Sequence, residues 1–481
     1  MSRIDTDVSI VKREKSVMPE ATHVTRSMAE FAVGLTYDDL PDDAIAAAKR
    51  FWLDSIACAF GGYRTEDARI IRELFRDMGG ASEATMLVSG DETSALTAAL
   101  VNSHLIRALD YNDIYWKQDP SHPSDIIAAG LAVGEREGRS GRDLIVATIL
   151  AYEFEMRLCE AAFPGIREYG WHHATLTGFV SPIVAGKMLD LTVDQMVHAI
   201  GISGARSCTL GAVTAGSLTM MKNTVDPLAT QNGVLAALLA ERGFTGPEHV
   251  IDGKEGLTHV FGHDWKLGIL TDGLGESFRI TQCGMKGFPT EALTHSPLTA
   301  LLRIVKAKRI VAEDVESIEV KTIRRAADIL SDPAKYNPTS KETADHSLPW
   351  CLAAAVARGR VTPAEFSDEA LADEAIRGVI GKIKVVAEPE FESMFPRLQP
   401  CEVTVVTRQG ERYVERLEYA KGDARDPLTD SEISEKFAAL SDGLLSSKRR
   451  GDIVAAVEDL ESADNVIEFA ALLVADRGTK E

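Results

Sequence analysis

An alanine-rich helical pattern over more than half of the chain limits the fold more than any other feature. Between about residues 25 and 280, apolar residues recur at three- and four-residue spacing, with repeated helix start and stop signals. Pro41 opens one segment, Thr192 and Gln195 form a capping box before another, and Gly243 ends a helix over residues 231–242. Because Ala and Gly on the apolar stripes allow close packing, we predict a large all-helical domain.

The hydrophobic period changes after residue 300. Alternating patterns at 315–323, 383–387, 401–407 and 412–417 predict strands, and Gln409-Gly410 predicts a hairpin turn between the last two. Helical patterns lie at 346–358 and 368–380. We therefore predict a mainly α protein with a large helical domain over residues 20–285 and a smaller α+β lid domain over 286–419. The helices expected within 420–481 should pack back on the large domain.

Charge and cysteine usage exclude several classes of partner. The chain has 52 Lys and Arg against 73 Asp and Glu, a formal charge of −21, which argues against nucleic acid and anionic membranes. No segment has the length of apolar sequence that spans a bilayer, and the start, Met1 to Met18, lacks the apolar core of a secretory signal. Scattered cysteines without metal-ligand spacing indicate a reducing, cytoplasmic setting. Because the chain as a whole is negatively charged, an anionic substrate would need a few Lys or Arg side chains at its binding site.

A long acidic segment separates the helices expected at about 94–109 and 125–137. It runs from Asp110 to Asp125 and contains two prolines that restrict its path, one of them next to His122. Asp110 and His122 are therefore candidate catalytic residues. Helix capping remains an alternative for the acids, Asp113, Asp119 and Asp125 above all.

Two adjacent histidines form a second candidate. His172 and His173 precede a helix of small residues that ends near Lys187. Because neighbours on a helix point to different faces, we expect one imidazole to transfer protons and the other to pack or hydrogen-bond. No partner residue stands at metal-ligand spacing, so we expect no metal.

The expected cations are Lys222 and Lys286, which lie outside charge-alternating runs. The second of these lies near the predicted domain junction, where clefts form, and is followed by Glu291 and His295. These four residues are candidate substrate-binding residues. The chain has no G-x-G-x-x-G, P-loop or G-x-S-x-G motif, so we expect no nucleotide cofactor. Proton abstraction next to a carboxylate, with loss of a leaving group, needs only the acids, bases and cations found here.

Six ordered blocks give the chain a resemblance to a known family. They are Leu53-Asp-Ser-Ile56, Leu109-Asp-Tyr-Asn-Asp113 with Ser121-His-Pro-Ser-Asp125, Trp171-His-His173 with Ala185-Gly-Lys187, Met221-Lys222 with Gln231-Asn-Gly233, Lys286-Gly-Phe-Pro-Thr-Glu291, and Thr343-Ala-Asp-His-Ser-Leu-Pro349. From about residue 25 to 460 the sequence resembles the methylcitrate dehydratase (MmgE/PrpD) family, which also includes cis-aconitate decarboxylases and an iminodisuccinate epimerase. The resemblance implies a metal-free homodimer with a site in the cleft between a helical domain and an α+β lid.

The resemblance also assigns residues. Asp110, His122, one of His172 and His173, Lys222 and Lys286 match the family's active-site positions. His173 fits the Trp-x-His spacing of the dehydratases, and His172 the Gly-x-His form of the decarboxylases.

We therefore expect a hydro-lyase that removes water from 2-methylcitrate or a related hydroxy-tricarboxylate, as in propionate catabolism. His173 or Asp110 would be the base and His122 the acid, although the sequence equally allows these three residues to exchange roles, and the two lysines would bind carboxylates. Glu291 and Trp350 stand at or near positions where decarboxylases carry histidine and tyrosine, which favours the dehydratase branch. The alternatives are decarboxylation or epimerisation of another polycarboxylate, such as cis-aconitate or iminodisuccinate, and a non-catalytic dimer that binds polyanions.

Overall fold

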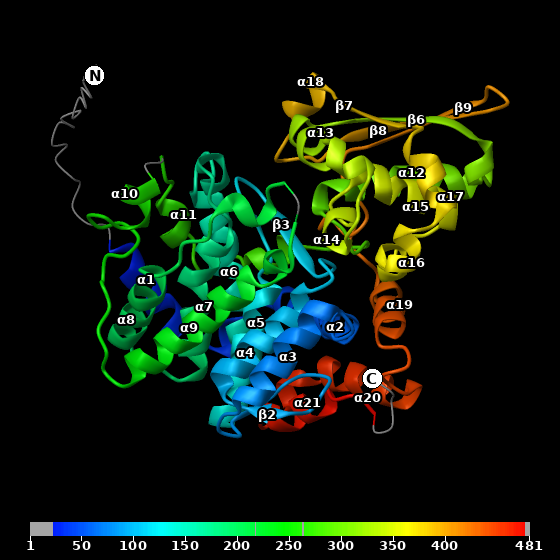
Figure 1. Cartoon of the computed structure of the whole chain (residues 1–481). Helices are drawn as coiled ribbons and strands as arrows, with labels where there is room; N and C mark the ends of the chain where they lie inside the picture. The colour runs from blue at the N-terminus through cyan, green and yellow to red at the C-terminus, as the bar shows by residue number, and fades with distance from the viewer. Residues whose placement is uncertain (1–22, 217, 262–263, 477–481) are drawn as a thin grey trace, which may run out of the picture.

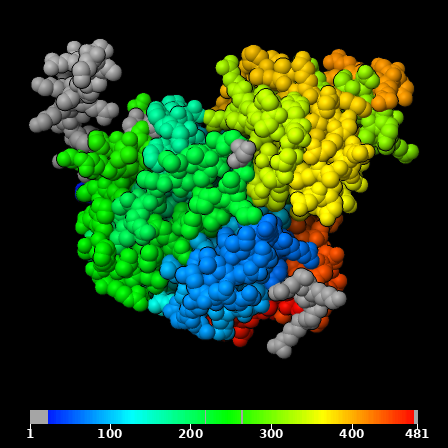
Figure 2. Space-filling model, viewed as in Figure 1, coloured from blue at the N-terminus to red at the C-terminus, as the bar shows by residue number. Residues whose placement is uncertain are grey.

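The structure is a computed structural model that describes residues 23–216, 218–261 and 264–476. The start of the chain, Met1 to Met18, lies outside these residues, and so do parts of the expected domains. Figure 1 shows a large helical lobe and a smaller lobe built on one sheet, and Figure 2 shows the two lobes in contact. The expected mainly α fold with a smaller α+β part is confirmed. Within the described ranges, no helix is long and apolar enough to cross a membrane.

The large lobe is organised around one central helix, α7 (Ala174–Met188), which is buried along almost its whole length. Helices α5, α6, α8 and α9 pack against it. Gly233 of α9 shows why small residues recur on these stripes: a Cβ added there would lie 2.1 Å from the Ser181 hydroxyl oxygen of α7. The other helices of this part of the chain are α1 (Val24–Gly34), α2 (Asp42–Gly62), α3 (Glu66–Met78), α4 (Ala95–Arg107), α5 (Ser124–Glu137), α6 (Gly141–Ala161), α8 (Val193–Gly204), α9 (Val225–Glu241), α10 (Leu257–Phe261) and α11 (Gly268–Thr271).

Local signals placed most helix ends correctly. Thr192 caps α8 with its Gln195 capping box, and Gly243, with φ +84°, follows the end of α9. Helix α9 begins at Val225, six residues before the expected start. Pro227 does not prevent this, because it lies in the first turn, where its missing N–H costs no hydrogen bond. The helix expected at 368–380 is two helices, because Asp373 caps the second of them.

The small lobe is a four-stranded sheet of order β7-β6-β8-β9, covered by helices that include α12 and α15. β6 (Val315–Thr322) pairs in parallel with β7 (Ile383–Ala387) and antiparallel with β8 (Cys401–Thr407), which pairs antiparallel with β9 (Arg412–Leu417). The four predicted strands are confirmed, and Gly410, at φ +83°, lies in the predicted hairpin turn. The helices are α12 (His295–Lys308), α13 (Arg324–Leu330), α14 (Lys341–Ala344), α15 (Leu348–Arg358), α16 (Asp368–Leu371), α17 (Glu374–Ile380) and α18 (Pro389–Glu392).

The chain then returns to the large lobe through α19 (Asp430–Leu440), α20 (Ser447–Glu458) and α21 (Val466–Leu472), drawn in orange and red in Figure 1. These helices pack on α2 and α5 and join the hydrophobic core of the large lobe. The Lys436 ammonium group of α19 lies 2.6 Å from both Asp54 Oδ1 and the Tyr111 carbonyl oxygen, and 3.2 Å from that of Lys286. The C-terminal segment thereby ties together two loops that carry candidate site residues.

The large lobe also contains short strands, so the expectation that it is all-helical needs correction. The acidic segment forms β3 (Asp113–Trp116) and β4 (Pro120–Ser121), and β3 also pairs with β5 (Gly284–Met285). A shorter pair joins β1 (Ala84–Thr85) to β2 (Glu92–Thr93). These strands are too short for a periodic sequence signal. The β3–β5 pairing places the residues after Arg107 beside Lys286.

Candidate active site

Asp110 lies at the centre of a buried group of charges between the lobes. It follows α4 with φ +50°, a left-handed conformation that non-glycine residues seldom adopt. Its carboxylate contacts the Arg107 guanidinium and lies 3.2 Å from Lys222 Nζ and 2.7 Å from Lys286 Nζ. Burial alone would raise the pKa of Asp110, but the three cations hold it well below its ordinary value. Asp110 therefore remains a carboxylate that is already paired, which makes it a poor base.

The two predicted lysines converge although they lie in distant segments. Lys222 comes from a short turn before α9 and Lys286 from the residue after β5, and both are almost fully buried. Burial lowers the pKa of Lys222 to about 8 and that of Lys286 below its ordinary value. Apart from its ion pair, Lys222 Nζ has no hydrogen-bond partner in the part of the chain that the structure describes. The two lysines can therefore also bind a negatively charged group of a ligand.

His122 faces the same cavity from the turn between β4 and α5. Its Nδ1–H donates to the Asp113 carbonyl oxygen at 2.7 Å, which leaves Nε2 as an acceptor. Burial, followed by the charges of Arg107 and Lys286, lowers the pKa of His122 well below its ordinary value. A neutral imidazole with a free lone pair suits a proton acceptor better than the acid role expected from the sequence.

His172 and His173 do not diverge as expected, because both lie in the turn before α7 and not within the helix. Their ring centroids are 3.9 Å apart, and both rings line the cavity that His122 faces. The His172 N–H donates to the Thr209 carbonyl oxygen at 2.8 Å, which fixes the turn. Burial lowers the pKa of His172 well below its ordinary value.

One set of side chains in the described ranges has the geometry of a metal site. Ligand atoms of His172, His173 and Asp226 all lie within 4.8 Å of one another. Sequence spacing could not reveal this set, because Asp226 lies on α9 and the histidines precede α7. Arg107 Nε lies only 3.9 Å from Asp226 Oδ2, and its positive charge opposes a cation at this position.

The remaining acids of the segment have structural roles. Asp113 accepts hydrogen bonds from the backbone N–H and hydroxyl of Ser124 and so caps the start of α5. Asp119 accepts the N–H groups of Ile166 and Arg167, and Asp125 accepts from Asn112 Nδ2 at 3.0 Å. The capping alternative is correct for Asp113, and Asp119 plays a similar role at another turn.

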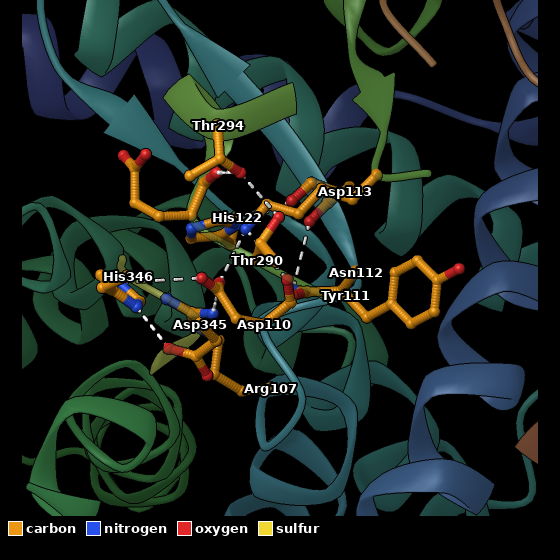
Figure 3. Close-up of polar contacts among 12 residues, drawn as sticks. Arg107, Asp110, Tyr111, Asn112, Asp113, His122, Thr290, Thr294, Asp345 and His346 are labelled. Carbon is orange, nitrogen blue, oxygen red and sulfur yellow. Dashed lines mark hydrogen bonds and ion pairs between the residues drawn. The ribbon is translucent and has the colours of Figure 1, made fainter. Parts of the chain in front are cut away.

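The small lobe contributes a histidine that the sequence analysis did not assign to the site. His346 Nδ1 lies 2.5 Å from Asp345 Oδ1, and its Nε2 lies 3.9 Å from Asp110 Oδ2 (Figure 3). Burial, followed by the charge of Lys222, lowers the pKa of His346 to about 4. Its block was part of the family resemblance, which was the signal that could have identified it.

The cavity encloses about 60 Å³ between the lobes. Its lining includes Glu291, whose pKa burial raises to about 7, and Arg107, a buried charged residue at the end of α4 that was not among the candidates from the sequence. His295 is not among the lining residues: its Nε2 lies 3.2 Å from the Thr290 carbonyl oxygen, and it lines a separate cavity with Met285. The polar and charged residues that line the central cavity are Arg107, Asp110, His122, Arg167, His172, His173, Thr214, Lys222, Lys286, Glu291, Lys335 and His346.

Comparison with known proteins covers both lobes. The profile of the MmgE/PrpD N-terminal domain matches residues 26–269, and that of the MmgE/PrpD C-terminal domain matches residues 288–462. The cis-aconitate decarboxylase-like protein oryM of Aspergillus oryzae is 26% identical, with 94% of this chain and 97% of the relative aligned. The cis-aconitate decarboxylase of Homo sapiens is 26% identical, with 94% of each aligned. The 2-methylcitrate dehydratase of Salmonella typhi is 24% identical over 68% of this chain and 71% of its own length.

Proposed function

Because the chain belongs to the MmgE/PrpD family, we propose that it is a lyase that forms a carbanion next to a carboxylate of a small polycarboxylate. The observation that carries the proposal is the group of Lys222, Lys286 and Arg107 around Asp110, which faces a cavity lined by imidazoles. Buried ammonium groups bind carboxylates and stabilise the negative charge that develops when a proton or CO₂ leaves. The imidazoles supply the proton transfer.

Our first candidate reaction is dehydration of 2-methylcitrate or a related hydroxy-tricarboxylate. A base removes the proton from the carbon next to a carboxylate, and the electron pair forms the double bond as the C–O bond breaks. The hydroxyl leaves as water after it takes a proton from an acid. His173 is our candidate base. Glu291 suits the acid better than His122, since its pKa of about 7 keeps part of it protonated near neutral pH.

The second candidate is decarboxylation of a substrate of the cis-aconitate type. The comparisons favour it, because decarboxylases align with 94% of the chain whereas the dehydratase of Salmonella typhi aligns with 68%. Here the bond to the carboxylate carbon breaks, CO₂ leaves, and the electron pair stays on the substrate until an acid returns a proton. The same lysines would hold the intermediate anion.

We further propose that the protein is a homodimer, as the family resemblance implied, and that it is cytoplasmic, as its scattered cysteines indicated. Leu210, Met221 and Leu228 each expose 40% or more of their surface and line one groove of the large lobe, an apolar area that a second copy could cover. Light scattering of the purified chain would measure its mass. A monomer at every concentration tested would contradict this part of the proposal.

The deciding experiment is a substrate screen with chelator-treated protein. 2-Methylcitrate, citrate and cis-aconitate would each be assayed for alkene absorbance and for released CO₂, and iminodisuccinate also for a change in optical activity, because epimerisation produces neither an alkene nor CO₂. An alkene without CO₂ supports the dehydratase, and CO₂ supports the decarboxylase. Loss of all activity on chelation that returns with a metal would contradict the metal-free mechanism. A lack of turnover on the whole panel would favour the non-catalytic polyanion-binding dimer.

A further inference from the structure

We propose that Asp226 is a positioning residue that selects His173, among three adjacent imidazoles, as the proton acceptor of this site. The inference rests on the proposed lyase function. Asp226 lies in the first turn of α9, is 1% exposed, and was not among the residues that the sequence suggested.

The three rings differ in what their nitrogen atoms contact. His122 donates through Nδ1 to a backbone carbonyl, and His172 Nδ1 accepts the Ala174 N–H at 3.2 Å. His173 Nε2 instead lies 3.5 Å from Asp226 Oδ2. Of these three rings, as the structure describes them, only His173 is within ion-pair distance of a carboxylate. The His122 and His173 ring centroids are 5.4 Å apart, so the rings can reach the same bound molecule.

A carboxylate at this position determines which nitrogen of His173 carries the proton. Asp226 accepts the Nε2–H, which leaves the lone pair on Nδ1, and it stabilises the imidazolium that forms when Nδ1 takes a proton. Both ring nitrogens of His173 and Oδ2 of Asp226 are buried without a hydrogen-bond partner among the described residues, so the Nε2–H is available to donate to this carboxylate oxygen and Nδ1 to accept a proton. The separation of 3.5 Å is long for a hydrogen bond, as is common in unliganded sites that tighten on binding substrate.

The surroundings keep Asp226 ionised. Burial alone would raise the pKa of Asp226, but His173, His172 and Arg107 hold it well below its ordinary value. The neighbouring Asp125 has the opposite shift: burial raises its pKa well above the ordinary value, and the charge of Asp226 adds to the increase. Of these two buried acids, Asp125 therefore carries the proton and Asp226 the charge.

Two further contacts hold the Asp226 carboxylate in place. Thr177 Oγ1 donates to its Oδ1 at 3.3 Å from α7, and Arg107 Nε lies 3.9 Å from its Oδ2. The same guanidinium contacts Asp110. One buried arginine thus connects the His173–Asp226 pair to the carboxylate between the two lysines, so the proton acceptor and the anion-binding group have a fixed relative position.

The test compares Asp226→Asn with Asp125→Asn, two isosteric changes beside the same arginine. In full-length protein with ¹⁵N-labelled histidine, we expect His173, assigned with His173→Gln, to show the Nε2–H tautomer. Asp226→Asn should shift it towards a mixture, whereas Asp125→Asn should leave it unchanged. On the substrate found in the screen, Asp226→Asn should lower kcat by about 100-fold, the order expected for a misplaced catalytic group, with little change in KM.

Several outcomes would overturn the proposal. The first is a wild-type His173 in the Nδ1–H tautomer, which needs no variant and so remains decisive if Asp226→Asn fails to fold. The second is an unchanged tautomer or kcat in a folded Asp226→Asn protein. The third is stoichiometric Zn²⁺ or Mn²⁺ binding that His172→Ala, His173→Ala and Asp226→Asn each abolish, since that result would make the three residues metal ligands. The tautomer can be read without turnover, so failure of the lyase function would be recognised separately.

Discussion

Lys286 Nζ lies 2.7 Å from Asp110 Oδ1, although 176 residues separate the two along the chain. The pairing of β3 with β5 makes this contact possible, because Asp113 lies opposite Met285 and so brings the following lysine to the segment that joins α4 to β3. The ammonium group also lies 3.1 Å from the Asp110 carbonyl oxygen. A short strand pair therefore assembles the centre of the site from two distant segments of the chain.

Lys286→Met should lower kcat/KM on the true substrate by about 100-fold or more, because it removes an ammonium group that holds carboxylate charge in a buried site. Lys384→Met is the matched control, since its side chain is 71% exposed on the small lobe and should keep wild-type kinetics. Steady-state kinetics of both variants would test this. Equal activity in the two variants would remove Lys286 from the site.

Asp110→Asn should lower the free energy of unfolding by about 3 kcal/mol, because it leaves three buried cations without their shared carboxylate. The pKa of Asp110 is well below its value in the unfolded chain, so as the pH falls the unfolded state binds a proton before the folded state does. The stability that Asp110 contributes is therefore complete above about pH 4 and is lost below it. Thermal unfolding against pH should show a smaller loss of Tm on acidification in Asp110→Asn than in wild type, and parallel curves would contradict this assignment.

Much of the fold followed from the sequence because its signals are local. The strands at 383–387, 401–407 and 412–417 have the expected ends, and the capping box at Thr192 marks the start of α8. Errors arose where distant segments determine the structure. The strands β3 and β5 form only by pairing with segments distant in sequence or too short to show a pattern, since β5 has two residues.

The site residues, too, could be predicted where the signal is local and not where it depends on contacts between distant segments. Asp110, His122, Lys222 and Lys286 stood out as charged or polar residues in unusual local settings, and the structure brings them to one cavity. Asp226 did not stand out, because an acid in the first turn of a helix is ordinary capping chemistry and only the packing of α9 on α7 brings it to His173. His295 is close to Lys286 in sequence, but it begins α12 and lines another cavity, which sequence proximity alone could not show.

His346→Gln should raise KM more than it lowers kcat, since the imidazole reaches the Asp110 group from the small lobe and helps enclose the ligand. His259→Gln, at an exposed position of the large lobe, is the control. Substrate-dependent rates of the two variants give the comparison. If His346→Gln instead turns over about 100-fold more slowly at saturating substrate and keeps the wild-type KM, His346 is a proton-transfer group.

Substrate binding should weaken above about pH 8. Lys222 binds a carboxylate only as an ammonium group, and burial lowers its pKa to about 8, so raising the pH removes this charge. We expect kcat/KM to fall on the alkaline side in wild type, and Lys222→Arg to move this fall to higher pH because a guanidinium stays charged. The ratio of variant to wild-type kcat/KM should therefore rise with pH. A constant ratio would mean that another group sets the alkaline limit.

Glu291→Gln separates the two candidate reactions. If Glu291 protonates the departing hydroxyl, dehydration should fall by about 10²- to 10⁴-fold in the variant, as expected for loss of a positioned acid. Wild-type dehydration should also decline above pH 7, because burial raises the pKa of Glu291 to about 7 and the acid form is lost as the pH rises through that value.

Glu313→Gln, on the surface of the small lobe, provides the matched control. In decarboxylation CO₂ leaves without taking a proton, so the bond-breaking step needs no acid. CO₂ release that persists in Glu291→Gln while water loss disappears would therefore identify Glu291 as the group that protonates the departing hydroxyl. Undiminished dehydration in Glu291→Gln would exclude Glu291 as the acid.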